Sequence, residues 1–231
     1  MQGFGVYFFL FFIPPLVLGF AVQRWLKKTV GQQMEVPVLN GLSGAEAARE
    51  ILDRNGLHAV PIERAAGGPL SDNYDPRKRT LFLSQPVYEG RSVASTAIAA
   101  HEVGHAIQHA KAYKPMEVRS ALFPVVSFAS NTWFILLMFG AFTRATGLVL
   151  VAVVLYGAVV LFQIVTLPVE FDASRRALRQ ITDLGLVTTG EHHGAKRVLT
   201  AAAMTYVAGA LAALSQLAYF VLVYFGGSRN N

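Results

Sequence analysis

The sequence predicts a mainly α-helical membrane protein, with about four transmembrane helices and one small α+β domain outside the bilayer. Hydrophobic residues make up 53% of the 231 residues and charged residues only 15%, a composition typical of membrane proteins. The charges are also placed unevenly, because four segments carry none: 1–23, 120–143, 145–169 and 198–228. Each segment is long enough for a spanning helix, which needs about 20 apolar residues.

The four spans are expected near 4–23, 121–142, 147–168 and 200–225. The first could instead be a cleaved signal peptide, but signal peptides carry basic residues before their apolar stretch. Here Arg24, Lys27 and Lys28 follow the apolar stretch. We therefore predict that residues 1–23 form a retained transmembrane anchor whose N-terminus lies outside.

The basic residues predict the orientation of the chain. Thirteen of the 20 Lys and Arg lie in 24–119 and five in 170–197, which leaves one between the second and third spans and one near the C-terminus. The positive-inside rule makes the side with eighteen of them cytoplasmic. This asymmetry accounts for the net charge of +6, and no basic-aromatic module indicates nucleic-acid binding. The absence of cysteine excludes disulfides and thiolate metal sites.

These observations divide the chain into the anchor, a cytoplasmic domain at 24–120, and a transmembrane region at 121–231 with a cytoplasmic loop at 169–199. Within the cytoplasmic domain, Ser43 and Glu46 form a capping-box pair that starts a helix, and Gly56 suits its C-terminal end. The pattern then predicts strands at 58–65 and 80–84, a turn at 74–76, a loop at 85–90 and a long helix at 92–112.

The long helix carries the stretch AAHEVGHAIQHA, in which His101, Glu102 and His105 form the pattern H-E-x-x-H. Residues four apart share one face of a helix, so two imidazoles can hold one metal ion from adjacent turns. Glu102 lies beside the ion without having to bind it, and can accept a proton from the metal-bound water. The small residues Ala97, Ala100 and Gly104 allow another backbone to approach closely. Zinc suits this donor chemistry.

The remaining histidines are weaker candidates for the third ligand. His109 lies eight residues beyond His101, about 12 Å along a straight helix, so one ion cannot reach both. We expect His109 to support the site or to be polar surface. His58 on a strand, and the adjacent pair His192 and His193 on a loop, are expected to be solvated.

Glu170 is the best candidate for the third metal ligand, because it is the first charged residue after the third apolar segment. Pro168 is expected to interrupt the helix there, at the membrane surface. Two crossings separate His105 from Glu170, which returns Glu170 to the side of the membrane where the histidines lie. Different residues predict the membrane topology and the metal site, and the two predictions agree.

Three stretches together resemble the YugP family of bacterial membrane-bound zinc metallopeptidases: LSDNYDPRKRTLFLS, HEVGHAIQHA and LPVEFDASRRAL. The resemblance extends over nearly the whole chain and implies a multi-pass protein of the bacterial cell membrane with zinc peptidase activity. It implies that His101, His105 and Glu170 bind zinc and that Glu102 is the general base. The layout also resembles, more distantly, the gluzincin group of zincins, where a glutamate on a later helix completes the site.

One position departs from the gluzincin pattern. Many gluzincins have an aspartate four residues after the third-ligand glutamate, which orients a ligating histidine. This chain has Ser174 at that position and Asp172 two residues earlier. The acceptor expected for each histidine therefore stays open among Asp172, Asp72 and Asp75.

The function expected is a zinc metalloendopeptidase working at the cytoplasmic membrane face on a peptide or protein substrate, with membrane proteins among the candidates. The strand at 80–84 is a candidate for pairing with substrate, and an ordinary interior strand is an equal alternative. The partners predicted are the substrate and the lipid bilayer, with no nucleic acid. The substrate's identity, the cleavage preference and the oligomeric state stay open.

Two other functions compete with this one. An intramembrane protease of the site-2 type would carry the motif inside an apolar span, whereas this motif helix is flanked by Arg91 and Lys111. A scaffold or adaptor with a structural zinc site would be expected to have four protein ligands, mostly cysteine. This chain has no cysteine, and Glu102 would have no role in such a site.

Overall fold

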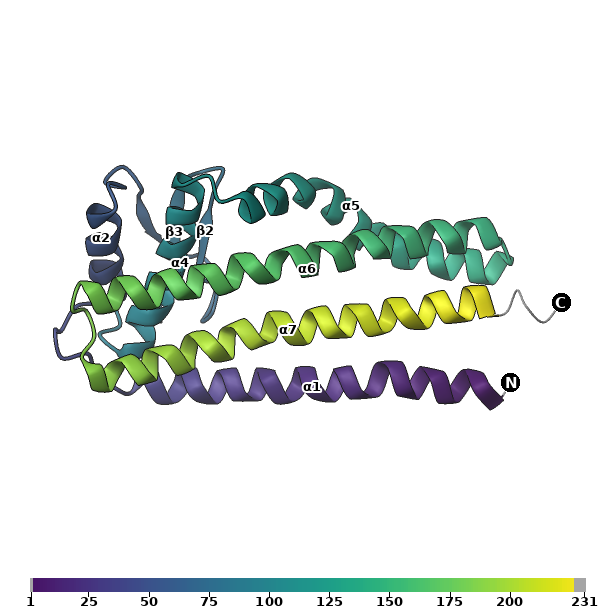
Figure 1. Ribbon diagram of the computed structural model, residues 1–231, viewed down its shortest axis with the longest axis horizontal. Coiled ribbons are helices and arrows are strands. Elements are labelled where there is room, and N and C mark those ends of the chain that lie inside the picture. Colours follow the sequence, from purple (N-terminus) through teal and green to yellow (C-terminus); the bar gives the residue numbers. More distant parts are fainter. Residues whose placement is uncertain (1, 227–231) are drawn as a thin grey trace. The chain divides into compact units, whose positions relative to one another are not determined.

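The computed structural model describes residues 2–226 and contains seven helices and three short strands within that range (Figure 1). In chain order they are α1 (Gln2–Met34), α2 (Gly44–Arg54), β1 (Ile62–Arg64), β2 (Asn73–Asp75), β3 (Thr80–Leu83), α3 (Gln85–Tyr88), α4 (Val93–Ala110), α5 (Lys114–Thr143), α6 (Thr146–Asp183) and α7 (Thr189–Gly226). The chain divides into two compact units. The apolar unit contains α1 up to Val22, 117–167, and α7 from Thr205, whereas the α+β unit contains Gln23–Met116 and Pro168–Met204.

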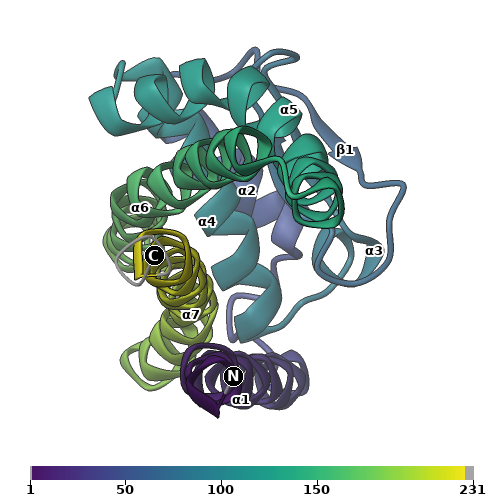
Figure 2. The ribbon, with the colours of Figure 1, turned by 90° about the vertical axis from the view of Figure 1, so that its right-hand side faces the viewer.

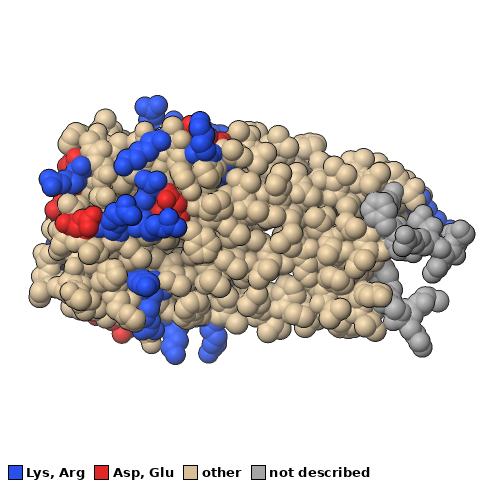
Figure 3. Space-filling model, in the orientation of Figure 1, with Lys and Arg blue, Asp and Glu red and all other residues tan. Residues whose placement is uncertain are grey.

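The apolar unit is built from parts of the four longest helices, which Figure 2 shows nearly end-on. Among the described residues, four helices are long and apolar enough to cross a membrane: Val6–Met34, Lys114–Thr143, Thr146–Asp183 and Thr189–Val223. Each of the four predicted spans therefore lies in a helix that is a candidate for crossing a membrane. Large apolar side chains on them are exposed, Phe20 at 71% and Phe142 at 89%. On the face in Figure 3, almost no charged side chain lies over this unit. Such a surface suits lipid rather than water.

Inside the apolar unit, polar side chains and rings join the helices. Ser215 Oγ on α7 donates to the carbonyl of Phe11 on α1 at 2.8 Å. Tyr156 Oη on α6 donates to Gln216 Oε1 at 2.7 Å, and the rings of Trp133 and Tyr156 lie 4.4 Å apart. Hydrogen bonds between helices contribute about 0.6–2 kcal/mol each in a bilayer, where apolar burial alone gives little.

The α+β unit has α4 at its centre, packed against α2 and against the sheet. The strand order is β1-β3-β2, with β1 parallel and β2 antiparallel to β3. The core is apolar and fully buried, with Ile51, Leu81, Val103 and Ile181 at 0% exposure. The predicted capping box is confirmed, because Ser43 Oγ accepts from the Glu46 amide and a Glu46 carboxylate oxygen accepts from the Ser43 amide.

Four predicted elements differ from the structure. The predicted strand at 58–65 is limited to β1, so His58, which was expected on a strand, lies in the turn before it. Tyr74 and Asp75, which were predicted to lie in a turn, belong to β2, which pairs with the neighbouring β3. The predicted loop at 85–90 contains the short helix α3.

The helix also does not stop at Pro168, because α6 continues to Asp183. Val169, Ala173, Ala177 and Ile181 are fully buried, and this four-residue spacing packs one helical face into the core. That burial offsets the hydrogen bond lost at proline.

The predicted cytoplasmic loop at 169–199 is therefore mostly helical. It consists of the end of α6, a short connection at 184–188 and the start of α7. His192 and His193, which were expected on a loop, lie in the first turns of α7.

Candidate metal centre

His101 and His105 lie one turn apart on α4, whose start is fixed by Ser92. Ser92 Oγ accepts from the amide of Ser95 and caps the first turn. The two imidazole rings have their centroids 4.8 Å apart and are nearly perpendicular, at 84°. His101 is partly buried and His105 is 7% exposed. The motif spacing therefore places two nitrogen donors on one largely buried helix face.

Glu170 on α6 meets these two histidines within the α+β unit. Its Oε2 lies 3.2 Å from His101 Nε2 and 3.6 Å from His105 Nε2. The ligand atoms of the three residues all lie within 4.8 Å of one another. Glu170 is 2% exposed, and a carboxylate so buried needs cationic partners. Two imidazole nitrogens and one carboxylate oxygen form a donor set that fits zinc.

Gly104 lets α4 approach α6 closely enough to bring these ligands together. A Cβ at this position would lie 2.6 Å from the carbonyl oxygen of Ala173 and 3.1 Å from its Cα. Both are backbone atoms, so no side chain could move aside for it. The predicted role of Gly104 in close backbone approach is confirmed, and the approaching backbone is the turn of α6 that follows Glu170.

Glu102 lies between the two histidines in sequence and is 8% exposed. Burial raises the pKa of Glu102, and the negative charges of Glu170 and Asp72 raise it further, against the opposing effect of His101 and His105. No hydrogen bond or ion pair holds its carboxylate within the described residues. A buried carboxylate that is not held by a partner and has a raised pKa can accept and return a proton.

Burial by itself lowers the pKa of His105, but the hydrogen bond and charge of Glu170 outweigh burial, so the pKa is raised. The Glu170 carboxylate thus favours the charged form of His105. A divalent cation at the same position would balance the carboxylate charge instead.

Neither motif histidine bonds to any of the aspartates considered from the sequence. His101 Nδ1 lies 3.2 Å from Ser174 Oγ, and His105 Nδ1 lies 3.0 Å from Gln108 Oε1. Ser174 lies four residues after Glu170 on α6, and its hydroxyl faces the ring of His101. Gln108 was missed, although residues three apart on a helix are neighbours. Its position three residues after His105 was the available signal.

The three aspartates contact other groups. Asp172 accepts from Gln108 Nε2 at 2.9 Å and from Arg176 Nε. Asp72 accepts from the amide of Ser84 at 2.8 Å, and Asp75 accepts from backbone amides in the turn that follows it. Asp172 therefore acts on His105 only through Gln108.

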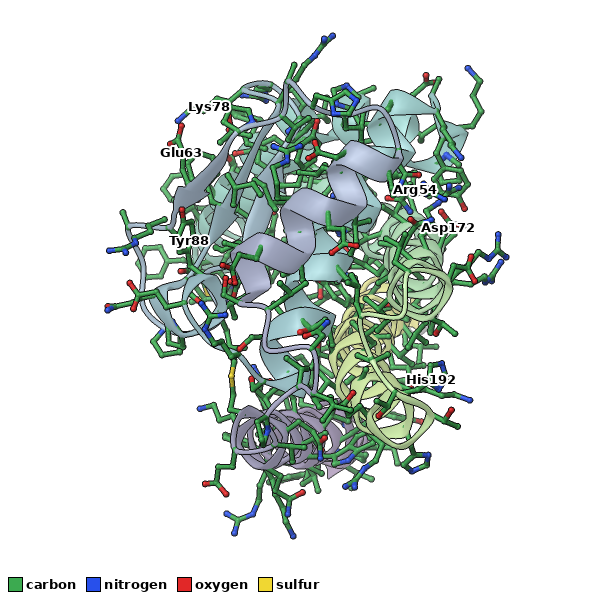
Figure 4. All side chains as sticks on the ribbon, turned by 90° about the vertical axis from the view of Figure 1, so that its left-hand side faces the viewer. Arg54, Glu63, Lys78, Tyr88, Asp172 and His192 are labelled. Atoms are coloured by element: carbon green, nitrogen blue, oxygen red, sulfur yellow. The ribbon has the colours of Figure 1, made fainter. Side chains whose placement is uncertain are left out.

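The other histidines lie outside the three-residue cluster. His109 Nδ1 is 2.9 Å from Tyr74 Oη on β2, and His58 Nδ1 is 3.0 Å from the exposed Asp53. His192 lies on α7, whereas Asp172 lies on α6 beside the site (Figure 4).

The strand considered for substrate pairing lies in the interior of the sheet. β3 is paired on one edge with β1 and on the other with β2. A substrate strand therefore has no free edge of β3 to join, and the alternative of an ordinary interior strand is the correct one.

Comparison with known proteins agrees with this chemistry. A family model described as "Putative neutral zinc metallopeptidase" matches residues 8–225, which include the motif and Glu170. The chain belongs to this family. The zinc metallopeptidase family match extends through both compact units.

Within the zinc metallopeptidase family, the chain is 43% identical over 219 residues to the "Putative membrane protease YugP" of Bacillus subtilis (strain 168). The match covers 95% of this chain and 97% of that protein. No solved structure matches the chain.

Proposed function

We propose that this protein is a membrane-bound zinc metalloendopeptidase that hydrolyses peptide bonds at the cytoplasmic membrane face. The observation that carries the proposal is the convergence of His101 Nε2, His105 Nε2 and Glu170 Oε2, with the carboxylate of Glu102 beside them. A histidine-pair helix completed by a glutamate from a later helix is a gluzincin-like arrangement. Membership of the zinc metallopeptidase family supports the same chemistry.

Zinc held by these three residues would activate a water molecule, lowering its pKa to about 7, and would polarise the substrate carbonyl. Glu102 takes the proton from the attacking water and later gives it to the leaving amine. Burial raises the pKa of Glu102, and a carboxylate with a raised pKa is a stronger proton acceptor.

Two features argue against the competing functions. The residues of the site lie in the α+β unit, and α4 is not among the four helices apolar enough to cross a membrane. This disfavours an intramembrane protease. A structural zinc site usually has four protein ligands, whereas the described residues offer a group of three. This disfavours a scaffold or adaptor.

The substitution Glu102→Gln tests the mechanism. It keeps the shape of the side chain but removes the proton acceptor, so peptide hydrolysis should fall by about 10²- to 10⁴-fold. Zinc content, measured on the same purified sample, should stay unchanged. Glu50→Gln serves as a control, because Glu50 is an exposed glutamate on α2. Normal hydrolysis by Glu102→Gln would overturn the proposal. A comparison of membrane proteomes between cells with the wild-type protein and cells with Glu102→Gln would reveal substrates that accumulate in the mutant.

The cytoplasmic orientation rests on the distribution of Lys and Arg, eighteen of which lie in 24–119 and 170–197. The absence of cysteine allows single-cysteine labelling without background. Glu63→Cys, on the exposed part of β1, should react with a membrane-impermeant maleimide only after cells are broken. Arg144→Cys, between α5 and α6, should react in intact cells. The reverse pattern would place the site outside.

A further inference from the structure

We propose that Gln108 is a positioning residue that decides which ring nitrogen of His105 binds the metal and couples His105 to the turn that carries Glu170. The inference rests on the proposed function only in taking zinc as the ion. Gln108 is on α4, one turn after His105, and is 0% exposed. A buried amide must satisfy its donors and its acceptor within the protein. The way it does so has consequences for His105.

The partners of Gln108 decide the orientation of its amide. Its Nε2 donates to the carbonyl oxygen of Val169 at 2.8 Å and to Asp172 Oδ2 at 2.9 Å. A backbone carbonyl can only accept hydrogen bonds. The ionised carboxylate of Asp172, which is paired with Arg176, can also only accept them. Turning the amide over would place Oε1 against these two oxygens. Oε1 must therefore face His105, and the orientation follows from chemistry rather than from a choice between similar atoms.

This orientation assigns the two nitrogens of His105. Gln108 Oε1 lies 3.0 Å from His105 Nδ1 and can only accept, so Nδ1 carries the hydrogen. Nε2 is then the nitrogen that can present a lone pair to a metal. It is also the nitrogen that faces Glu170 Oε2. The hydrogen bond on one side of the ring thus prepares the other side for an ion.

Gln108 also connects the two chain segments that supply the ligands. Its acceptors, Val169 and Asp172, lie immediately before and two residues after Glu170 on α6. A shift of this turn along α4 would break both hydrogen bonds and release the amide that holds His105. One side chain therefore links the position of Glu170 to the ring orientation of His105.

Asp172, which accepts from Gln108, is itself held in place by a second partner. Arg176, one turn after Asp172 on α6, donates from Nε to Asp172 Oδ2. The Arg176 guanidinium lies over the ring of Tyr113, 5.7 Å from its centroid. This pairing keeps Asp172 an acceptor, which in turn keeps the Gln108 amide pointing its oxygen at His105.

The first experiment measures zinc affinity of the full-length, detergent-solubilised protein by competition with a chelator. Gln108→Met keeps the length of the side chain but removes every hydrogen bond, and should weaken zinc binding by about 10- to 100-fold. Gln180→Met is the matched control, because Gln180 also bridges two elements, accepting from Asn55 Nδ2 at 2.9 Å. It should bind zinc as the wild type does. Unchanged affinity in folded Gln108→Met would overturn the inference.

The second experiment starts from the wild type, so its first result does not depend on how a variant folds. Ring-nitrogen NMR of the zinc-loaded wild type, with isotope-labelled histidine, should show that His105 carries its hydrogen on Nδ1 and binds through Nε2. Binding through Nδ1 would overturn the inference. Gln108→Glu retains an acceptor for Nδ1 and should preserve this signature while losing affinity, because its carboxylate repels Asp172. Neither measurement requires catalysis, so an inactive protein would refute the proposed peptidase and leave this inference standing.

Discussion

The two helices that form the site, α4 and the second half of α6, contribute to it in different ways. On α4 the two ligands are set by local geometry, because residues four apart on any helix face the same side. On α6 the ligand is set by packing, since Glu170 reaches the histidines only when Val169 and Ala173 are buried against the core. One half of the site is thus a property of a helix, and the other half is a property of the fold.

The supports of the two histidines differ as well. His105 is held by an amide whose orientation is decided by two acceptors on α6. His101 is held by the hydroxyl of Ser174 at 3.2 Å, and a hydroxyl can either donate or accept. The support of His105 therefore specifies a ring nitrogen, whereas the support of His101 leaves the choice to Glu170 and the ion.

The largest effect should come from removing the ligand on α6. Glu170→Ala leaves both histidines on α4 but takes away the only carboxylate in the three-residue cluster of described ligands. Zinc content should fall from about one ion per chain to near zero after dialysis, because two imidazoles alone hold zinc weakly. Metal analysis of the purified protein measures this. Glu50→Ala is the control, and full zinc content in Glu170→Ala would mean that the third ligand lies elsewhere.

An intermediate effect should follow from separating the two helices without touching a ligand. In Gly104→Ala the new Cβ would meet the Ala173 carbonyl oxygen at 2.6 Å, and overpacking of this kind costs about 1–3 kcal/mol of stability. Both thermal stability and zinc affinity should fall.

Gly31→Ala is the matched control for Gly104→Ala, because a Cβ there meets nothing within 4 Å. Replacing a helical glycine in open space should stabilise the protein by about 1 kcal/mol. If Gly104→Ala behaved like Gly31→Ala, the close approach of α4 and α6 would not be needed for the site.

The smallest effect should come from the hydroxyl that supports His101. Ser174→Ala should weaken zinc binding by less than about tenfold, since the hydroxyl does not select a ring nitrogen. Gln108→Met should have the larger effect in the same chelator competition. Equal effects of the two substitutions would contradict the difference between the two supports.

Some of the fold was predictable because its signals are local. The capping pair Ser43 and Glu46 marked the start of α2, and the uncharged segments marked the four long apolar helices. β2 was missed because three residues carry too little pattern to identify a strand, and its pairing with β3 supplies most of its stability. The continuation of α6 past Pro168 could have been recognised from the sequence, because apolar residues recur there every four residues, at Val169, Ala173, Ala177 and Ile181.

The sequence by itself determined the number of apolar helices, the histidine pair on one helix face and Glu170 as a candidate ligand. These depend on composition and helix periodicity, which are properties of neighbouring residues. Only the tertiary structure decided that Glu170 meets the histidines, and that Gln108 and Ser174 hold their rings instead of the three aspartates. Hydrogen bonds between distant segments depend on how the helices pack, and no local pattern records that.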